Sequence, residues 1–178
     1  YAGIDMRGKT AVILVNDPGF VTGDPELFQG RAMTYHGRWT YKYEEAARQG
    51  AAGAIIVHEE APAAYPWEVL RNGAGRPQLA IDAPGSDVSR VEIEGWITRD
   101  AALKVFSAAG LDYDTVKAAA ARRGFRPMPL PLRANVRVTN VIRRTTSNNV
   151  VGVLRGTKRP YEYIVYTAHW DHLGKAPA

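Results

Sequence analysis

The sequence predicts an α/β fold, because two apolar runs of strand length flank a segment with the features of a helix. The runs cover residues 11–15 and 53–57, and both are too short to be buried helices. Between them, Thr40 can cap a helix over residues 41–49, and Gly50 stands where a left-handed residue commonly ends a helix. Strand, helix and strand at this spacing form a crossover unit, so we expect the two strands to be parallel.

The rest of the first half contains two loop-like segments and one more strand. Residues 18–38 are polar and rich in Gly, and residues 61–87 are rich in Pro, Gly and Ala, with one short strand expected at residues 79–81. Residues 91–98 alternate between apolar side chains and acidic or polar ones. This alternation predicts an antiparallel strand with one face in solvent.

Two helices are expected to follow that strand. Thr98 can cap the first, which should run to about residue 109 and end at Gly110. The second is expected over residues 114–123, with Gly124 as its end.

A proline-rich segment predicts a domain boundary. Residues 126–132 contain three prolines, which cannot continue a helix and favour an extended linker. We therefore expect two domains, residues 1–126 with their connecting helices and residues 127–178. In the second, apolar patterns at residues 135–142, 149–154 and 161–167 predict three strands joined by short turns.

Composition excludes several classes of protein. The 178 residues are 46% hydrophobic and 23% charged, which is typical of globular domains. No window reaches the ~18 apolar residues of a membrane-spanning helix, so we expect no membrane span. The chain has no cysteine, which excludes disulfides, thiolate metal sites and cysteine nucleophiles but identifies no compartment.

Charge is distributed unevenly along the chain. Residues 1–116 carry 11 basic and 16 acidic side chains, whereas residues 117–159 carry 11 basic and none that is acidic. A basic segment can bind nucleic acid, but Phe125 is the only aromatic residue there, so bases have almost nothing to stack on. We favour the alternative that this segment packs against an acidic protein surface and expect no nucleic acid as a partner.

One short motif indicates metal chemistry. His169 and Asp171 stand two residues apart at the carboxyl end of the predicted strand at residues 161–167. Period-two geometry puts both on one side, where the carboxylate of Asp171 can orient the imidazole of His169 as a zinc ligand. A histidine bonded to a backbone carbonyl at a strand end explains the same pattern equally well, and a catalytic zinc needs about three protein ligands.

Other candidate residues give weaker indications. Glu59 and Glu60 could include a general base, but adjacent carboxylates at a strand end are usually solvated, and we expect that here. His172 is expected in a loop, while His36 and His58 do not complete a metal site.

The second half of the chain resembles a known enzyme family. Residues 147–152 (SNNVVG), the turn Arg155–Gly156 and residues 163–174 (YIVYTAHWDHLG) are similar to the start of the catalytic domain in the clan MH zinc aminopeptidases. These are two-zinc exopeptidases of the bacterial leucyl aminopeptidase and glutamate carboxypeptidase type. The resemblance implies the first three strands of an α/β/α zinc exopeptidase domain.

The first half resembles the protease-associated domain that is often inserted in those enzymes. The similarity covers residues 5–9 (DMRGK), 33–39 (MTYHGRW) and 42–54 (KYEEAARQGAAGA). The two segments stand in the expected order, and together they cover nearly the whole chain. The fold expected for the first half is therefore a mixed sheet with flanking helices, with its N-terminal strand clipped.

The resemblance implies roles for two residues. His169 matches the family's first zinc-ligand histidine, and Asp171 matches the aspartate that orients it. The parent enzyme would use two zinc ions to release N-terminal residues from peptides, and it would be secreted or periplasmic in a bacterium. The remaining ligands and the general base are expected beyond Ala178, which would leave this chain alone inactive and without tightly bound zinc. Its partners would be a peptide substrate and the rest of its own catalytic domain.

A rival interpretation is a binding module without catalytic residues. Protease-associated domains supply none of their own, and the loop at residues 18–38, with its aromatic side chains, is a candidate contact surface. Phe28 and Tyr35 are the candidates for gating substrate access or contacting a partner. The alternative is that both side chains cover the domain's own core.

Overall fold

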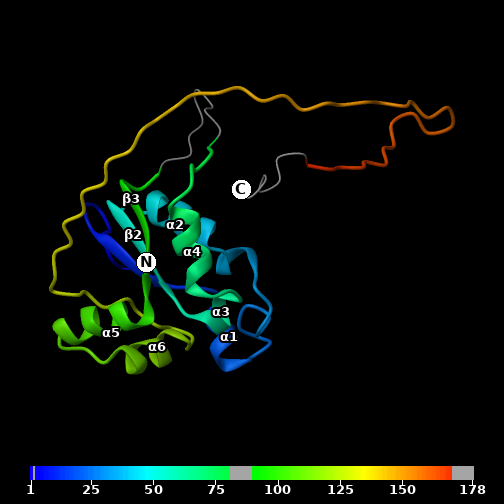
Figure 1. Ribbon diagram of the computed structural model, residues 1–178. Helices are drawn as coiled ribbons and strands as arrows, with labels where there is room; N and C mark the ends of the chain where they lie inside the picture. Colours follow the sequence, from blue (N-terminus) through cyan, green and yellow to red (C-terminus); the bar gives the residue numbers. More distant parts are fainter. Residues whose placement is uncertain (2, 81–89, 170–178) are drawn as a thin grey trace. The chain divides into compact units, whose positions relative to one another are not determined.

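The computed structural model describes Tyr1, residues 3–80 and residues 90–169. It divides the chain into two units, Tyr1–Arg137 and Val138–Ala178 (Figure 1). The first unit contains ten regular elements among its described residues: β1 (Thr10–Leu14), α1 (Pro18–Thr22), η1 (Tyr35–Gly37), α2 (Trp39–Arg48), β2 (Gly53–His58), α3 (Glu60–Ala63), α4 (Trp67–Ala74), β3 (Ile93–Thr98), α5 (Arg99–Ala108) and α6 (Tyr113–Ala120).

The three strands form one parallel sheet in the order β1-β2-β3 (Figure 1). Ala11 pairs with Ala54, and Ile56 pairs with Trp96. The predicted crossover from β1 through a helix to a parallel β2 is confirmed, as is the α/β class. The helix α2 begins at Trp39, after Arg38, so Thr40 is not its cap; Gly50, at a φ of 76°, is left-handed as expected.

The predicted antiparallel direction of the third strand is wrong, because β3 runs parallel to β2. The connection between them is long enough for a crossover and contains α3 and α4. The alternation of its sequence has a different cause. Among the described strands β3 is the last in the sheet, and Glu92 and Glu94 near its start are exposed.

Local capping signals position the two helices that follow β3. The hydroxyl of Thr98 accepts a hydrogen bond from the Ala101 amide at 3.2 Å, which confirms the predicted cap of α5. The carboxylate of Asp112 accepts one from the Thr115 amide at 2.7 Å and caps α6. The helix α6 ends at Ala120, three residues before the predicted end.

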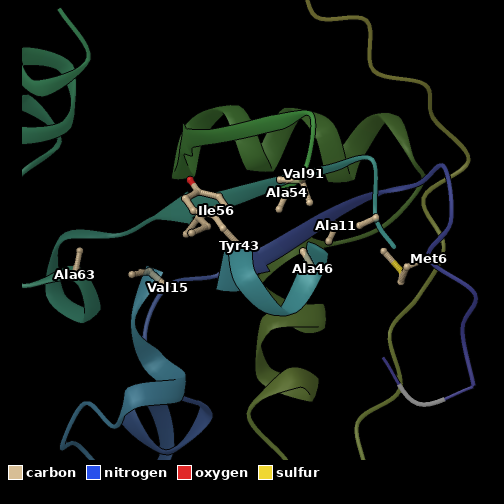
Figure 2. Close-up of a cluster of buried hydrophobic side chains, with 10 residues drawn as sticks. Met6, Ala11, Val15, Tyr43, Ala46, Ala54, Ile56, Ala63 and Val91 are labelled. Carbon is tan, nitrogen blue, oxygen red and sulfur yellow. The ribbon is translucent and has the colours of Figure 1, made fainter. Parts of the chain in front are cut away.

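The two faces of the sheet support separate hydrophobic clusters. On one face, Tyr43 and Ala46 of α2 pack against Ala11, Ala54 and Ile56 of the strands (Figure 2). The opposite face packs against α5 and α6 through a second group of side chains: Val12, Leu14, Val57, Ile97, Ala102, Phe106 and Tyr113. Alternate strand positions therefore serve opposite helix layers, as the pleat requires.

The segment at residues 61–87 is more helical than its composition predicts. It contains α4, which begins after Pro66, where proline can precede a first turn. No strand forms at Leu79 and Ala80, and the side chain of Leu79 is exposed; Ile81, the last residue of that predicted strand, lies outside the described residues.

The described part of the second unit contains no strand, so the predicted meander is not formed. Apolar side chains in all three predicted strand segments are exposed: Val138, Val141, Ile142, Val150, Val151, Val153, Leu154, Tyr161, Tyr163, Ile164, Val165 and Tyr166. Strand formation depends on backbone pairing and on a surface that buries one face, and isolated hairpins are marginal in water. The alternating pattern alone does not supply either requirement. None of the helices in the described residues has the length and apolar content that crossing a membrane requires.

Truncation of an isoleucine side chain should lower stability in the first unit but not in the second. Ile56 of β2 is 0% exposed, and Ile56→Ala should lower the free energy of unfolding by about 2–4 kcal/mol, because it removes buried contacts and leaves a cavity. The matched Ile142→Ala, at an exposed position of the second unit, should change it by less than about 0.5 kcal/mol. Urea denaturation measures both values, and equal losses would contradict this assignment of the core.

Candidate functional site

Polar side chains gather at the carboxyl edge of the parallel sheet. Asn16 and Asp17 follow β1, His58 ends β2 with Glu59 next to it, and Arg99 follows β3. The first three of these are buried. This edge is where ligands bind in open α/β sheets, so the partners of each group decide whether it is available to a ligand.

Asp17 ties the loop after β1 to the sheet. One of its carboxylate oxygens accepts a hydrogen bond from the Thr34 amide at 2.7 Å. A Cβ atom added to Gly37 would lie 2.7 Å from the same oxygen, so this close approach requires glycine. Beside it, the amide of Asn16 donates to the Pro62 carbonyl at 2.8 Å and joins the ends of β1 and α3.

Lys42 of α2 completes this anchor. Its ammonium donates to the Asn16 carbonyl at 2.9 Å and to the His36 carbonyl at 3.4 Å. Burial lowers the pKa of Lys42 to about 8, and the negative charge of Asp17 partly opposes that shift. The amine therefore holds η1 against the end of β1 at the cost of desolvation.

The loop after β1, η1 and the first turn of α2 present four aromatic rings, which we call the aromatic surface cluster: Phe28, Tyr35, His36 and Tyr41. All four contacts between neighbouring rings are edge-to-face. The ring centroids of His36 and Tyr41 are 4.7 Å apart, those of Tyr35 and Tyr41 are 5.3 Å apart, and those of Phe28 and His36 are 5.9 Å apart. The cluster thus brings together both loop residues that the sequence suggested, Phe28 and Tyr35.

Phe28 and Tyr35 do not cover the core. Their side chains are 41% and 56% exposed, and neither belongs to the two buried clusters. Phe28 and Gln29 both have positive φ values, 50° and 61°, a region that bulky side chains rarely adopt. The loop therefore holds Phe28 in a costly conformation while leaving its ring accessible, a combination typical of functional loops.

Charged residues of α2 border the cluster. The hydroxyl of Tyr35 donates to a carboxylate oxygen of Glu44 at 2.9 Å, and this hydrogen bond raises the pKa of Tyr35. The guanidinium carbon of Arg48 lies 5.3 Å from the centre of the Tyr41 ring, and its Nε lies 2.8 Å from a carboxylate oxygen of Glu45.

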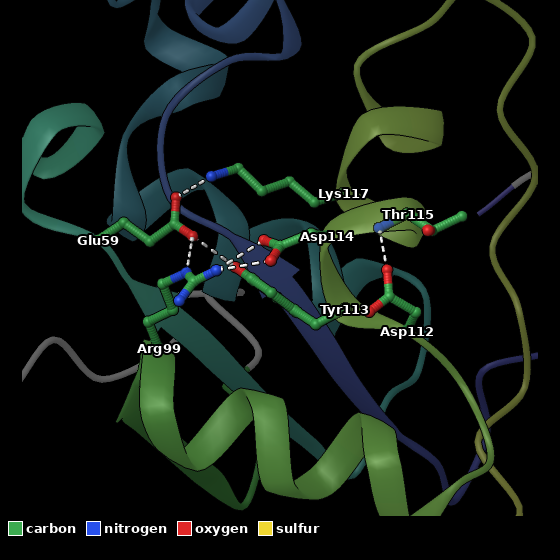
Figure 3. Close-up of polar contacts among 7 residues, drawn as sticks. All are labelled: Glu59, Arg99, Asp112, Tyr113, Asp114, Thr115 and Lys117. Carbon is green, nitrogen blue, oxygen red and sulfur yellow. Dashed lines mark hydrogen bonds and ion pairs between the residues drawn. The ribbon is translucent and has the colours of Figure 1, made fainter.

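On the other side of the sheet edge, Glu59 is the centre of an ionic network (Figure 3). Its carboxylate accepts a hydrogen bond from the Tyr113 hydroxyl at 3.0 Å, pairs with Lys117 and lies 3.6 Å from Arg99. Arg99 in turn contacts Asp114 at 2.7 Å. The Glu59 side chain is only 11% exposed, so the expectation of a solvated carboxylate is wrong for Glu59, whereas its neighbour Glu60 is exposed.

His58 is enclosed by aromatic rings rather than by metal ligands. Its Nε2 lies 3.0 Å from the Tyr65 carbonyl, and its ring contacts those of Tyr65, Trp67 and Trp96 at centroid distances of 5.5–6.2 Å. This is a packed histidine that links β2, the segment before α4, and β3.

Of the predicted metal site, His169 belongs to the described residues and Asp171 lies outside them, as does His172, which is expected in a loop. Within residues 1–169, apart from the undescribed positions, no three His, Asp or Glu side chains lie close enough to hold a metal ion. His36, His58 and Glu59 are therefore not part of such a group.

Sequence reasoning missed Lys42, Tyr41 and the role of Glu59. The sequence does indicate that Tyr41 can meet Arg48, because the two residues stand about two turns apart on one helix and therefore share a face. No local pattern could reveal Glu59, since its partners Tyr113 and Lys117 stand 54 and 58 positions away.

The ionic network makes a testable contribution to stability. Glu59→Gln should lower the free energy of unfolding by about 1–3 kcal/mol, because it leaves partly buried Lys117 without a carboxylate. The neighbouring Glu60→Gln removes the same charge from an exposed position and should change stability by less than about 0.5 kcal/mol. If denaturation gave equal values for the two variants, the network would not hold α6 to the sheet.

The lowered pKa of Lys42 predicts a dependence of stability on pH. The unfolded chain, with a pKa near 10.5, binds more protons than the folded one above the folded pKa of about 8, so stability should rise with pH through this window. Relative to Lys42→Met, the unmodified protein should gain about 1–2 kcal/mol between about pH 7 and about pH 9.5. The exposed Lys104→Met serves as the control and should show no such trend. A flat difference for Lys42→Met would contradict the burial argument.

Comparison with known proteins gives no relative for this chain: no family model, curated protein or solved structure matches it. A functional assignment therefore depends on the residues and contacts described above.

Proposed function

We propose that this chain is part of a zinc-dependent aminopeptidase, in which the first unit contacts peptide through the aromatic surface cluster and His169 supplies a zinc ligand. The observation that carries the proposal is the order of two segments in one chain. A small α/β unit precedes residues 164–174, in which His169 and Asp171 follow an apolar run.

The chemistry of His169 fits the proposal in part. Neutral imidazole is a common zinc ligand, and a carboxylate two residues later can hold its second ring nitrogen. The described residues provide no group of three ligands, so His169 could act only with ligands from outside them. When bound, zinc would polarise the scissile carbonyl and activate water.

The contacts of the first unit favour a supporting role. Asp17 bonds Thr34, Lys42 bonds two carbonyls, and Glu59 bonds Tyr113 and pairs with Lys117, so each of these charged groups is committed to holding elements together. The aromatic surface cluster differs, because the exposed rings of Phe28, Tyr35 and His36, packed with half-buried Tyr41 of α2, offer a rigid surface to a peptide. Aromatic side chains dominate such contacts because they bury large areas at low entropic cost.

A second candidate is a peptide-binding module without catalysis. The same aromatic surface cluster favours it, because ring contacts require no metal. The two candidates differ in whether His169 matters: a binding module predicts no effect of a metal chelator or of His169→Ala.

Hydrolysis by the natural full-length protein decides between them. Release of the N-terminal residue from a short peptide should be abolished by a chelator and restored by zinc. His169→Ala should lower kcat/KM by at least about a hundredfold, because loss of a zinc ligand impairs both metal binding and catalysis. His172→Ala removes the same side chain three residues away, at a position without a proposed metal role, and should retain activity.

Two outcomes would contradict the peptidase. The first is a folded, zinc-loaded protein that hydrolyses no N-terminal residue from a range of peptides. The second is equal activity in His169→Ala and the unmodified protein. Zinc content measured by atomic absorption separates loss of the metal from loss of fold in each variant.

A further inference from the structure

The aromatic surface cluster already has a cation at its border. The guanidinium of Arg48 lies over the Tyr41 ring, with its central carbon 5.3 Å from the ring centre. One guanidinium nitrogen lies 2.8 Å from a Glu45 oxygen, and another lies 3.9 Å from a Glu44 oxygen. An aromatic face and two carboxylates thus surround one positive charge.

The remaining cluster residues fix the shape of this site. The hydroxyl of Tyr35 donates to Glu44 and holds that carboxylate beside the rings. The ring of His36 packs edge-to-face against both Tyr35 and Tyr41. Because Lys42 donates a hydrogen bond to the His36 carbonyl, the arrangement is also tied to the partly buried contacts of Lys42 and Asp17 at the end of β1.

The side chain of Arg48 is accessible to solvent, so a competing cation can reach its partners. Its side chain is 51% exposed, and that of Glu44 is 36% exposed. Glu45 is 22% exposed and also accepts a hydrogen bond from Gln49 at 2.8 Å through its other carboxylate oxygen. Exposed ion pairs between neighbouring turns of a helix contribute little, because water and salt compete for both charges. The carboxylates and the Tyr41 face would therefore accept a second guanidinium in exchange for the first.

We propose that the aromatic surface cluster binds an arginine side chain of a peptide partner, which takes the place of Arg48 over Tyr41 and between Glu44 and Glu45. This deepens the peptide-contacting role proposed above and rests on it. Arginine is preferred to lysine, because a planar guanidinium can stack on a ring while it donates to carboxylates in the same plane. Arg48 then acts as an internal competitor that weakens binding.

Binding of defined peptides to the chain of residues 1–178 tests this inference without any catalysis. The probes are two fluorescently labelled Ala-Ala-Xaa-Ala-Ala peptides, with arginine or its neutral isostere citrulline at the centre, followed by fluorescence anisotropy. The arginine peptide should bind more tightly than the citrulline peptide. Arg48→Gln should increase affinity for the arginine peptide about three- to tenfold, because it removes the competitor and one positive charge.

Two further variants locate the contact. Adding Tyr41→Leu to Arg48→Gln should reverse the gain, since leucine retains apolar area but offers no ring face. Lys104→Gln removes an exposed positive charge from α5 and should leave affinity unchanged. Circular dichroism verifies that each variant is folded.

Certain results would overturn the inference. One is equal binding of the arginine and citrulline peptides to Arg48→Gln; another is a gain in Lys104→Gln as large as in Arg48→Gln, which would indicate only a general charge effect. Absence of binding to both the unmodified chain and folded Arg48→Gln would also refute it. None of these results bears on zinc-dependent hydrolysis, which the full-length protein and His169→Ala test separately.

Discussion

The surface loop of the first unit depends on one partly buried polar contact, the hydrogen bonds that Lys42 donates to the carbonyls of Asn16 and His36 beside Asp17. A parallel strand that ends inside a protein leaves backbone groups that need partners, and a buried unpaired group costs free energy. Here a lysine from the crossover helix satisfies two carbonyls, and an aspartate satisfies the Thr34 amide of the returning loop. The loop part of the aromatic surface cluster is consequently attached to the sheet through hydrogen bonds, which explains how Phe28 and Tyr35 can remain exposed in a fixed arrangement.

Glu59 has the same function on the other face of the sheet. It binds Tyr113 and Lys117 of α6 and approaches Arg99 at the start of α5, so one carboxylate at the end of β2 attaches both helices. Desolvating a carboxylate is costly, and such a cost is tolerated when hydrogen bonds and opposite charges surround it. The two networks commit the ionisable groups at this edge to architecture. The aromatic surface cluster, bordered by Glu44, Glu45 and Arg48, is not used in this way and remains accessible to a binding partner.

Local signals predicted the parts of the fold that depend on neighbours in sequence. The β1–α2–β2 crossover follows from two apolar runs and a helix of suitable length, and the cap at Thr98 involves residues only three apart. The direction of β3 did not follow, because alternation reports which side chains meet solvent and not which way the neighbouring strand runs. The sequence predicts a solvated Glu59, because nothing near it reveals its partners in a helix more than 50 positions away. The aromatic surface cluster is likewise only partly predictable. Phe28 and Tyr35 can be identified in the sequence by residue type, whereas their contacts with His36 and Tyr41 depend on how α2 packs against the loop.

In the second unit, the proposed role of His169 as a metal ligand depends on how the residues before it are packed. Ile164, Val165 and Tyr166 precede His169, and their side chains are exposed in the structure. A zinc ligand has to be held in place by the groups around it, since a misplaced imidazole loses affinity for the metal. Burying an exposed apolar run in a sheet would be favourable, because it removes apolar surface from water. Under the proposed function, both requirements are met by the same event: the surface that covers these side chains also fixes the position of His169. Zinc binding and burial of the strand segment should then be thermodynamically coupled, as in proteins whose metal sites form only on folding.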